Sequence, residues 1–573
     1  MERQYPRPQL QREEWVNLNG LWSFEFDDSN SGIERRWFES QCFSKTIVVP
    51  FPYQSKLSQI DQQDPHDVVW YQRNFNVEQN KQVIIHFGAV DYEAQVYING
   101  QFVGSHKGGS TSFSFDITPF LIEGEQSLVV RVYDPSFDSY ISRGKQTWRL
   151  EPFEVFYHRT TGIWQTVWLE YVDENHVTKL KTTPLFDENT FEIELFTNTC
   201  KEKEVFITVS YEGEKITSVE GFLQDRNKFT LKLDHTIHHW TPETPHLYDF
   251  LIEAFVQGKL IDTFTSYGAL RKFSIKENRI LLNNKPYFLR LALDQGYYRD
   301  GLLTYPTEKD LLNDILLAKQ MGFNGVRKHQ KIEAERFLYY ADKLGFLVSL
   351  EMPSAYKYSF SKAFINEWID AIERDYNYVS LFMYVPINES WGVRAINERK
   401  DIQDYVNGLF YLTKAHDPSR ITITNDGWEQ TITDICAIHT YRHGKMDELT
   451  IQSEFRKSLL DLDTLLSPIH TWGNKPIYVD GYHYNGEPIL LSEFGGISYA
   501  NKKQKGWGYT GVNTPKAYQE ELERLFDIVY ESKLLSGFCY TQLTDVEQEI
   551  NGLLDYDRNP KLPIEVIKKI IER

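Results

Sequence analysis

Two glutamates end strongly apolar segments in the C-terminal half of this 573-residue chain. Glu389 closes the run Leu381–Glu389, and Glu493 closes the run Pro488–Glu493. An ionisable side chain at the end of a buried segment costs free energy unless the protein uses it. Paired carboxyls suit glycoside hydrolysis, in which one protonates the leaving oxygen and the other acts on the anomeric carbon.

The roles of the two carboxyls depend on their separation. Like charges in one cleft push their pKa values apart, so one group can be the acid while the other stays ionised. A separation of about 5 Å gives retention and about 6.5–9.5 Å gives inversion, and the sequence leaves that distance open. A structural role beside an arginine is the alternative for either glutamate alone. Two glutamates, one after Asn388 and one before Phe494, favour catalysis.

The elements that must position these glutamates form a (β/α)8 pattern over residues 275–573. Eight strand-like runs alternate with helix-like runs, and catalytic residues of such barrels lie at the C-terminal ends of the strands. A doubly wound sheet is the alternative, but it would normally bring a glycine-rich phosphate turn, which the sequence lacks. The predicted strands are Tyr287–Leu293, Gly325–Arg327, Leu347–Met352, Leu381–Pro386, Ile421–Asn425, Ile435–His439, Ile489–Ser492 and Gly537–Gln542.

Residues 1–172 and 173–274 are predicted to form two β-sandwiches that precede the barrel. In the first, Gln95–Gly104 alternates on either side of Asn99-Gly100, a strong hairpin signal, which favours a jelly roll. In the second, short alternating runs such as Glu204–Ser210 have the size and rhythm of an immunoglobulin-like sandwich.

The composition argues against several classes of partner. The net charge is -19 and no dense Lys/Arg block occurs, so no nucleic-acid partner is expected. Four scattered cysteines give no metal-binding spacing, and no segment is apolar enough to span a membrane. The N-terminus has no apolar signal segment, so we expect a cytoplasmic protein. Because no ligand spacing indicates a metal site, we expect no metal or other cofactor.

Short motifs in all three segments resemble glycoside hydrolase family 2, which contains β-galactosidases, β-glucuronidases and β-mannosidases. Leu18–Trp22, Val96–Gly100 and Gly162–Trp168 resemble its sugar-binding jelly roll, and Trp240–Tyr248 resembles a motif of its immunoglobulin-like domain. The likeness covers almost the full length. It implies a C-terminal TIM barrel and a retaining mechanism through a covalent glycosyl-enzyme intermediate.

The resemblance also implies roles for single residues. Asn388-Glu389 matches the Asn-Glu pair of the fourth barrel strand, so Glu389 would be the acid/base and Asn388 would hold the sugar 2-hydroxyl. Ser492-Glu493-Phe494 matches the setting of the nucleophile on strand seven, so Glu493 would attack the sugar. The other implied substrate-binding positions are Asp294, Arg327, His329, His439, Tyr441 and Tyr540.

Several of these positions carry more specific expectations. Arg327 either lines the site or pairs with the nucleophile carboxylate. Tyr441 is expected to hydrogen-bond the nucleophile, and Tyr540 to be an aromatic platform on strand eight. His439 is either a sugar ligand or a packed barrel histidine. Asp294, at the end of strand one, is expected to bind sugar hydroxyls.

Some residues depart from the family pattern or lie outside it. Family β-glucuronidases carry Asn-x-Lys after strand eight, but the sequence here is Glu549-Ile-Asn551, so that carboxylate clamp is absent. Trp507 is expected to stack on the sugar or act as a lid. The loop Arg143–Trp148 would either reach the active site or stay solvated, and its polar composition favours the solvated loop.

The leading hypothesis is hydrolysis of a terminal β-linked sugar, with β-galactosidase as the default. The alternatives are another neutral exo-glycosidase (arabinopyranosidase, mannosidase or glucosidase) and a carbohydrate-binding protein without turnover. A metal-dependent hydrolase ranks lower, because its candidate ligands have no HxH or HExxH spacing: His439, His443, Asp294 and Glu351. The expected partner is a carbohydrate, and family habits imply a homo-oligomer.

Overall fold

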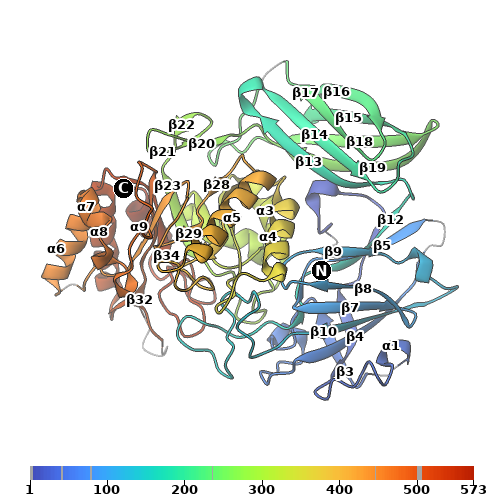
Figure 1. Cartoon of the computed structure of the whole chain (residues 1–573), viewed down its shortest axis with the longest axis horizontal. Coiled ribbons are helices and arrows are strands. Elements are labelled where there is room, and N and C mark those ends of the chain that lie inside the picture. Colours follow the sequence, from blue (N-terminus) through green and yellow to red (C-terminus); the bar gives the residue numbers. More distant parts are fainter. Residues whose placement is uncertain (1–3, 41–42, 78–80, 235–236, 446, 500–505) are drawn as a thin grey trace.

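The structure is a computed structural model that describes residues 4–40, 43–77, 81–234, 237–445, 447–499 and 506–573. Three parts follow one another along the chain. Figure 1 shows the first in blue at the lower right, the second in green at the upper right, and the third, which ends in red, on the left. The third part carries both glutamates.

The first part is the predicted jelly roll, built from two main antiparallel sheets. Their orders are β3-β2-β4-β10-β7-β8 and β1-β12-β5-β9. The hairpin at Asn99-Gly100 is confirmed, because both residues have the positive φ (51° and 77°) that a two-residue type I′ turn requires. The strands are β1 (Trp15–Asn17), β2 (Gly20–Phe26), β3 (Lys45–Val49), β4 (Val68–Phe75), β5 (Gln82–Phe87), β6 (Val90–Asp91), β7 (Glu93–Ile98), β8 (Gln101–Lys107), β9 (Phe113–Asp116), β10 (Gln126–Tyr133), β11 (Gly162–Ile163) and β12 (Val167–Val172).

The second part is the predicted immunoglobulin-like sandwich of two antiparallel sheets, β13-β14-β17 and β16-β15-β18-β19. Alternate residues of each strand, such as Val205, Ile207 and Val209, point into the core between the sheets. The strands are β13 (Val177–Leu185), β14 (Thr190–Thr197), β15 (Lys203–Tyr211), β16 (Glu214–Leu223), β17 (Arg226–Lys232), β18 (Tyr248–Val256) and β19 (Lys259–Gly268).

The third part is a TIM barrel, as predicted, with each of the eight predicted strands present. The strands are parallel, in the order β28-β26-β25-β24-β23-β34-β31-β30, and Thr422 and Asp434 join the two ends through hydrogen bonds of 2.8 and 3.0 Å. These strands are β23 (Leu289–Asp294), β24 (Gly325–Lys328), β25 (Leu347–Glu351), β26 (Leu381–Val385), β28 (Ile421–Thr422), β30 (Cys436–Thr440), β31 (Ile489–Gly495) and β34 (Leu535–Thr541). The short strands are β20 (Phe273–Lys276), β21 (Arg279–Leu282), β22 (Lys285–Pro286), β27 (Ile387–Asn388), β29 (Asn425–Asp426), β32 (Ile497–Tyr499) and β33 (Thr510–Val512).

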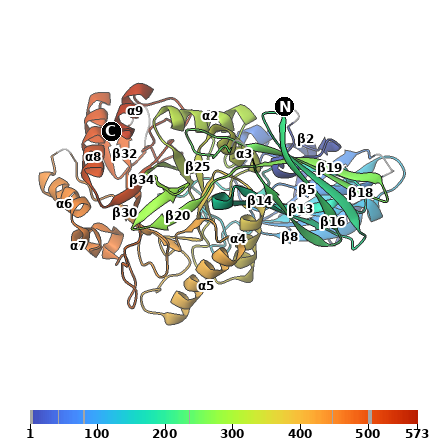
Figure 2. The ribbon, with the colours of Figure 1, turned by 90° about the horizontal axis from the view of Figure 1, so that it is seen from above.

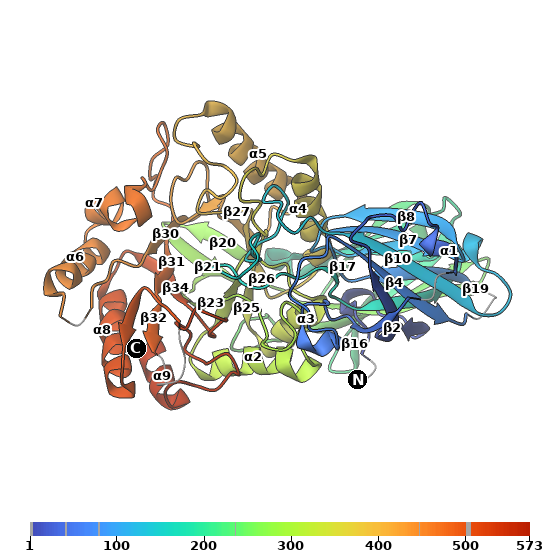
Figure 3. The ribbon, with the colours of Figure 1, turned by 90° about the horizontal axis from the view of Figure 1, so that it is seen from below.

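Helices lie around the barrel strands, as the views from above and below show (Figures 2 and 3). Thr307 is the N-cap of α2; its hydroxyl bonds the Asp310 carboxylate at 2.6 Å and accepts no backbone N–H. The helices are α1 (Trp37–Ser40, in the jelly roll), α2 (Glu308–Gln320), α3 (Glu335–Leu344), α4 (Lys362–Asp375), α5 (Lys400–His416), α6 (Leu449–Leu460), α7 (Leu462–Leu465), α8 (Pro515–Glu531) and α9 (Ile564–Ile571). Among the described residues, no helix combines the length and apolarity needed to cross a membrane.

Buried polar contacts attach both sandwiches to the barrel. Asp342 on α3 accepts a hydrogen bond from Tyr267 of the immunoglobulin-like part at 2.8 Å, and its backbone carbonyl accepts one from Trp240 at 2.9 Å. Glu367 on α4 accepts hydrogen bonds from Ser110 and Ser142 of the jelly roll. Because these groups are buried, the jelly roll and the barrel present a shared interior surface rather than two solvated faces.

Candidate active site

The structure brings Glu389 and Glu493 together at the C-terminal ends of the barrel strands. Glu493 lies on β31, and Glu389 directly follows β27. A carboxylate oxygen of one lies within 4.8 Å of a carboxylate oxygen of the other. The Glu493 side chain is 5% exposed and that of Glu389 is 21% exposed, so Glu389 is the more accessible of the two.

The backbone at Glu389 is unusual for a residue with a side chain. Glu389 and Ser390 have φ values of 51° and 59°, in the left-handed region that favours glycine. Hydrogen bonds of 2.9 Å hold both residues, from Glu389 N–H to the Asp426 carbonyl and from Ser390 N–H to the Asn425 side chain. A strained conformation that the surroundings enforce is typical of a functional position.

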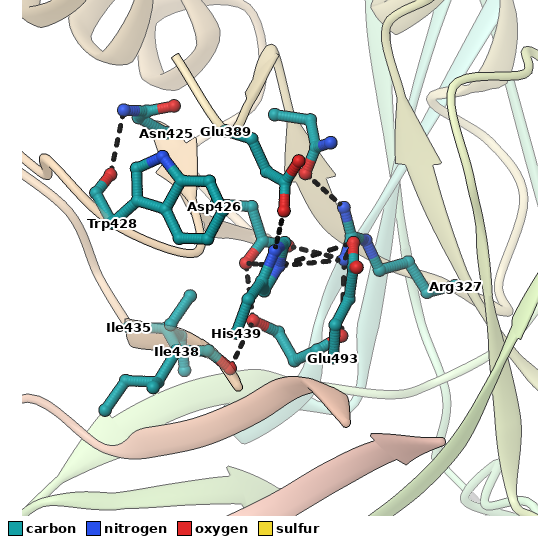
Figure 4. Close-up of polar contacts among 12 residues, drawn as sticks. Arg327, Glu389, Asn425, Asp426, Trp428, Ile435, Ile438, His439 and Glu493 are labelled. Atoms are coloured by element: carbon teal, nitrogen blue, oxygen red, sulfur yellow. Dashed lines mark hydrogen bonds and ion pairs between the residues drawn. The ribbon is translucent and has the colours of Figure 1, made fainter. Parts of the chain in front are cut away.

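Three groups fix the Glu493 carboxylate. Tyr441 donates its hydroxyl to Oε2 at 2.5 Å, and Arg327 Nη1 donates to Oε1 at 2.9 Å. His439 Nε2 lies 3.4 Å from Oε1 (Figure 4). The contact of Tyr441 is the one predicted from the sequence. Arg327 pairs with the Glu493 carboxylate, which was one of the two roles expected for it.

His439 is fully buried and joins the two glutamates, so it is neither a sugar ligand nor a merely packed histidine. Its Nδ1 donates to Glu389 Oε1 at 2.8 Å, and its Nε2 faces Asp426 Oδ1 at 3.2 Å (Figure 4). A neutral imidazole has one N–H, whereas both nitrogens here face carboxylate oxygens. A ring protonated at both nitrogens would donate to both carboxylates, and the donor Arg327 Nη1 also lies 3.3 Å from Nε2.

The electrostatics of the site favour the ring protonated at both nitrogens. Burial lowers the pKa of His439, but Glu493 and Asp426 outweigh it and raise the pKa to about 10. Burial raises the pKa of Glu493, against the opposing effect of His439 and Arg327. For Glu389, burial also raises the pKa, but the hydrogen bond from His439 prevails and the pKa is lowered.

Arg327 is the centre of a buried network beneath the glutamates. Its side chain is 0% exposed, and it donates from Nε to Glu351 Oε2 at 2.7 Å and from Nη2 to Asn388 Oδ1 at 2.9 Å. Its Nη1 lies 3.2 Å from Asp426 Oδ2. Sequence reasoning missed Asp426, although it follows the fifth predicted strand directly, where the same rule that selected Glu389 would have found it.

His329 and Asn388 lie beside this network. His329 Nε2 is 3.5 Å from Glu351 Oε1 and 4.0 Å from Glu493 Oε1, and Asn388 Nδ2 is 3.4 Å from the same ring nitrogen. Burial, with the positive charges of Lys145 and Arg327, holds the pKa of His329 well below its usual value. A neutral ring at this place can donate or accept one hydrogen bond toward a substrate.

Two predicted ligands have structural surroundings instead. Tyr540 is 0% exposed and packs on Phe494 and Phe526 in the core between strands and helices, so the aromatic platform predicted for it is wrong. Asp294 is 1% exposed, with Oδ2 2.7 Å from Lys328 Nζ and Oδ1 2.8 Å from the Gly296 N–H. Because both its oxygens have protein partners, Asp294 has the geometry of a buried ion pair and not of a sugar ligand.

Trp507 reaches the site through a second aromatic residue. Its indole N–H donates to the Glu154 carbonyl of the jelly roll at 3.0 Å, and its ring meets Tyr509 edge-on at 5.5 Å. Tyr509 in turn stacks on Tyr441 with ring centroids 3.5 Å apart. The sequence pattern did not reveal Tyr509, because only the fold places it on Tyr441, the tyrosine that bonds Glu493.

The loop Arg143–Trp148 is buried, which corrects the favoured solvated reading. Arg143 and Gly144 donate backbone N–H groups to the Ser354 carbonyl of the barrel at 3.1 and 3.2 Å. Lys145, the next residue, is 7% exposed, and the carboxylates acting on it include Glu493 and Glu389. The jelly roll therefore brings a positive charge close enough to act on the two glutamates.

Glu389, His439 and Glu493 are also a group whose donor atoms converge closely enough for a cation. In this structure the two ring nitrogens of His439 already face Glu389 and Asp426, and Arg327 occupies the Glu493 oxygen. Of the metal ligands considered from the sequence, Asp294 pairs with Lys328 and His443 Nε2 bonds the Gly495 carbonyl at 2.7 Å. The four candidates thus do not form one site.

Family models match all three parts of the chain. The sugar binding domain of glycosyl hydrolases family 2 matches residues 15–173, the model named glycosyl hydrolases family 2 matches 175–271, and the family's TIM barrel domain matches 273–573. These matches confirm the resemblance found from the short motifs.

Individual relatives carry two different names. A β-galactosidase of Thermoanaerobacter pseudethanolicus is 28% identical over 71% of this chain, which spans about half (53%) of that protein's length. A β-glucuronidase of Streptococcus agalactiae is 23% identical, with 96% of this chain and 95% of that protein covered.

Solved structures show the same architecture. A β-glucuronidase from Ruminococcus gnavus, in complex with C6-substituted uronic isofagomine, has a TM-score of 0.80 at 18% identity, with 99% of both chains covered. A Lactobacillus rhamnosus β-glucuronidase has a TM-score of 0.79 at 19% identity, with 99% of this chain and 98% of that chain covered. Such identities show a shared fold. Together with the three matched domain models, which run from residue 15 to residue 573, they lead to one assignment: the chain belongs to glycosyl hydrolases family 2.

Proposed function

We propose that this protein is a retaining exo-β-glycosidase in which Glu493 is the nucleophile and Glu389 is the acid/base. One observation carries the proposal: the two carboxylates approach within 4.8 Å at the strand ends of the barrel. Retaining enzymes hold their carboxyls about 5–5.5 Å apart, whereas inverting enzymes leave room for a water molecule between carboxyl and sugar. The observed spacing favours direct attack on the sugar.

The surroundings distinguish the two roles. Glu493 is fixed by Tyr441 and Arg327, and a nucleophile needs such orientation because its attack tolerates little misalignment. Glu389 is more exposed and has one side-chain hydrogen bond, to His439, so it can reach the oxygen of a departing group. An acid/base must serve the leaving group and then a water molecule, which requires access from solvent.

The proton for the leaving group is held by the pair Glu389–His439. The Nδ1 proton of His439 lies on a 2.8 Å hydrogen bond to Glu389 Oε1, so its transfer gives a neutral imidazole and a carboxylic acid. Glu493 then bonds to the anomeric carbon while the glycosidic C–O bond breaks, and the departing oxygen takes the proton from Glu389. In the second half, Glu389 removes a proton from a water molecule while the water oxygen bonds to the anomeric carbon. The bond between that carbon and Glu493 breaks, which releases the sugar and frees Glu493.

A neutral terminal sugar is the proposed substrate class, with β-galactosides as the default. Glu549 and Asn551 occupy the place of the Asn-x-Lys clamp, and they bond each other at 3.0 Å. A carboxylate on the sugar would meet that negative charge. The runner-up is a β-glucuronide, which the names of the S. agalactiae relative and of the similar structures favour. Arabinopyranosides, mannosides and glucosides remain further neutral candidates.

Hydrolysis of 4-nitrophenyl glycosides tests the proposal. The panel contains the β-galactoside, β-glucuronide, β-mannoside, β-glucoside and α-L-arabinopyranoside, each given to the wild type, Glu493→Ala and Glu389→Ala. We expect cleavage of a neutral glycoside by the wild type and none by Glu493→Ala. Glu389→Ala should lose less activity on the nitrophenyl substrate than on a poorer leaving group, because nitrophenolate departs without protonation.

Folding and stereochemistry provide the controls. Both variants should keep the circular dichroism spectrum of the wild type, and NMR of the first product formed should show the anomer of the substrate, β for the β-glycosides and α for the α-L-arabinopyranoside. Formation of the opposite anomer would contradict the retaining assignment, and wild-type rates in both variants would contradict the site. Sugar binding without cleavage of any glycoside would favour the carbohydrate-binding alternative.

A further inference from the structure

The loop of residues 134–161, between β10 and β11 of the jelly roll, runs against the barrel (Figures 1 and 3). Loops of this length without strands or helices are uncommon and usually have a function. This loop is held at close range: Gly144 has a φ of 57°, and a Cβ at its position would lie 2.5 Å from the Gln330 carbonyl. Gln330 directly follows His329, so Gly144 places the loop beside the sugar-facing end of the barrel.

Hydrogen bonds on both sides fix the backbone of Lys145. Its own carbonyl accepts from the Tyr157 N–H at 2.8 Å, and Thr147 N–H donates to the Tyr157 carbonyl at 2.8 Å. The neighbouring Gln146 side chain bonds Asp91 Oδ2 at 2.7 Å and accepts from Thr160 N–H at 2.7 Å. Lys145 is therefore presented from a rigid backbone and not from a mobile turn.

The ammonium group of Lys145 lacks a protein partner. Lys145 is 7% exposed, yet within the described ranges of the chain Nζ has no hydrogen bond and no carboxylate oxygen within 4.0 Å. The contacts found are with the rings of Tyr157 and Phe156, at 5.7 and 5.8 Å from their centroids. A lysine with so little exposure normally has an ion-pair or hydrogen-bond partner, because removing its charge from water otherwise costs free energy.

The carboxylates that act on Lys145 include both glutamates of the proposed active site. Burial lowers its pKa, and the carboxylates that act in the opposite direction are, in order, Glu549, Glu493, Glu389 and Glu351. Glu549 is 2% exposed and accepts the Tyr157 hydroxyl at 2.5 Å. Each carboxylate oxygen can accept two hydrogen bonds, and Glu549 accepts one at each, from Tyr157 and from Asn551, so both oxygens retain acceptor capacity.

We propose that Lys145 and Glu549 together bind hydroxyl groups of the terminal sugar, Lys145 as donor and Glu549 as acceptor. This inference rests on the proposed glycosidase function and names the part of the site that sets its sugar preference. A hydroxyl can accept from an ammonium and donate to a carboxylate at once, which would satisfy both groups. The specificity of the barrel site would then depend on a residue of the jelly roll.

The charges favour a hydroxyl over an anionic group as the ligand. Five carboxylates border the site and three cations oppose them: Glu351, Glu389, Asp426, Glu493 and Glu549 against Lys145, Arg327 and His439. A sugar carboxylate would add to an existing excess of negative charge. A neutral hydroxyl adds none.

Deoxy substrates test the inference with Lys145→Met. The nitrophenyl glycoside that the wild type cleaves best is compared with its 3-, 4- and 6-deoxy analogues. For the wild type, removing the bound hydroxyl should lower kcat/KM by about 10- to 100-fold, the worth of one hydrogen bond to a charged group. Lys145→Met should lose at least about tenfold on the parent glycoside. Its further loss on that one analogue should be smaller than the loss of the wild type, since both changes delete the contact with Lys145 and only the contact with Glu549 is left to lose.

Matched measurements separate this role from a structural one. Arg149→Met removes an exposed cation from the same loop and should leave all rates unchanged. The Tm of Lys145→Met should equal or exceed that of the wild type, because a buried ammonium without a partner is removed. Parent kinetics within about twofold of the wild type, or equal losses on every analogue with a lowered Tm, would overturn the inference. Loss confined to the β-glucuronide would instead identify a carboxylate ligand and overturn it as well.

Binding measurements keep the inference testable if the glycosidase proposal fails. Should the wild type cleave no glycoside of the panel, calorimetric titration with D-galactose, D-glucose, D-mannose and L-arabinose still compares it with Lys145→Met. A sugar bound by the wild type and at least about tenfold more weakly by Lys145→Met supports the contact. Equal affinity, or binding by neither protein, refutes it.

Discussion

Replacing His439 with asparagine should narrow the pH range in which the enzyme works. Asparagine preserves a side-chain N–H donor but cannot take up a proton. The variant therefore removes the group that holds the proton and keeps much of the shape of the side chain. In the wild type, the catalytic proton is present at every pH at which either His439 or Glu389 is protonated. Coupled groups of this kind lose their proton at a pKa that belongs to the pair.

The size of the effect follows from the distances. The ring nitrogens of His439 lie 2.8 Å from Glu389, 3.2 Å from Asp426 and 3.4 Å from Glu493, and these carboxylates raise its pKa from 6.5 to about 10. The alkaline limb of kcat/KM should therefore lie near pH 10 in the wild type. In His439→Asn the proton resides on Glu389 alone, so the alkaline limb should fall well below pH 10, because an isolated carboxyl loses its proton at lower pH than the pair.

The acidic limb should move in the opposite direction. The charge of His439 helps to lower the pKa of Glu493, which must be ionised to attack. Two unit charges about 4 Å apart interact by about 1–4 kcal/mol between bulk water and a protein surface, and one pKa unit is about 1.4 kcal/mol. Without His439, the pKa of Glu493 should rise further, because one of the charges that lowers it is removed, and activity should appear only at higher pH.

Initial rates from pH 4 to 11 measure both limbs. A phenyl or alkyl glycoside is needed for the alkaline limb, because its leaving group requires the proton, whereas a dinitrophenyl glycoside should show little alkaline loss in either protein. An alkaline limb at the same pH in wild type and His439→Asn would refute the shared proton. An equal loss of activity on the alkyl or phenyl glycoside and on the dinitrophenyl glycoside would show that His439 acts on folding or binding instead.

Three further variants test other contacts. Tyr441→Phe deletes the 2.5 Å hydrogen bond to Glu493 and should lower kcat about 10- to 100-fold, measured by steady-state kinetics, with an unchanged Tm as control. Arg327→Met leaves buried carboxylates unpaired and should cost about 3–5 kcal/mol, seen as a lowered Tm in calorimetry; an unchanged Tm would contradict the network. Tyr540→Leu should lower Tm while KM stays within about twofold, whereas a large rise in KM at constant Tm would restore the aromatic platform.

Periodicity was sufficient to locate the barrel. The apolar runs ending at Glu389 and Glu493 are strands buried on both faces, and such strands are visible as continuous hydrophobic segments. The rule that barrel chemistry lies at strand ends then selected both glutamates. Motif resemblance added Tyr441, whose contact with Glu493 depends on strand six standing next to strand seven.

Burial produced by contact between domains was not predictable in this way. Arg143–Trp148 is polar and has no period, so it reads as a solvated loop, although packing between jelly roll and barrel removes it from water. The prediction for Tyr540 failed for a different reason. An aromatic residue at a strand end can face the cavity or the helices, and its 0% exposure follows from packing against α8, which the sequence pattern does not specify.

The chemistry of Arg327 explains why the site tolerates so many buried charges. Its guanidinium has five N–H donors in a fixed plane, and it contacts Glu351 at the end of strand three, Asn388 after strand four and Glu493 on strand seven. A lysine would neutralise one carboxylate as a point charge but could not hold three strand ends at fixed angles. The side chain that binds Glu493 therefore also binds Asn388, the residue next to Glu389. One planar group thus links the backbone segments that carry the two glutamates, while His439 and the Asp426 carbonyl hold Glu389 itself.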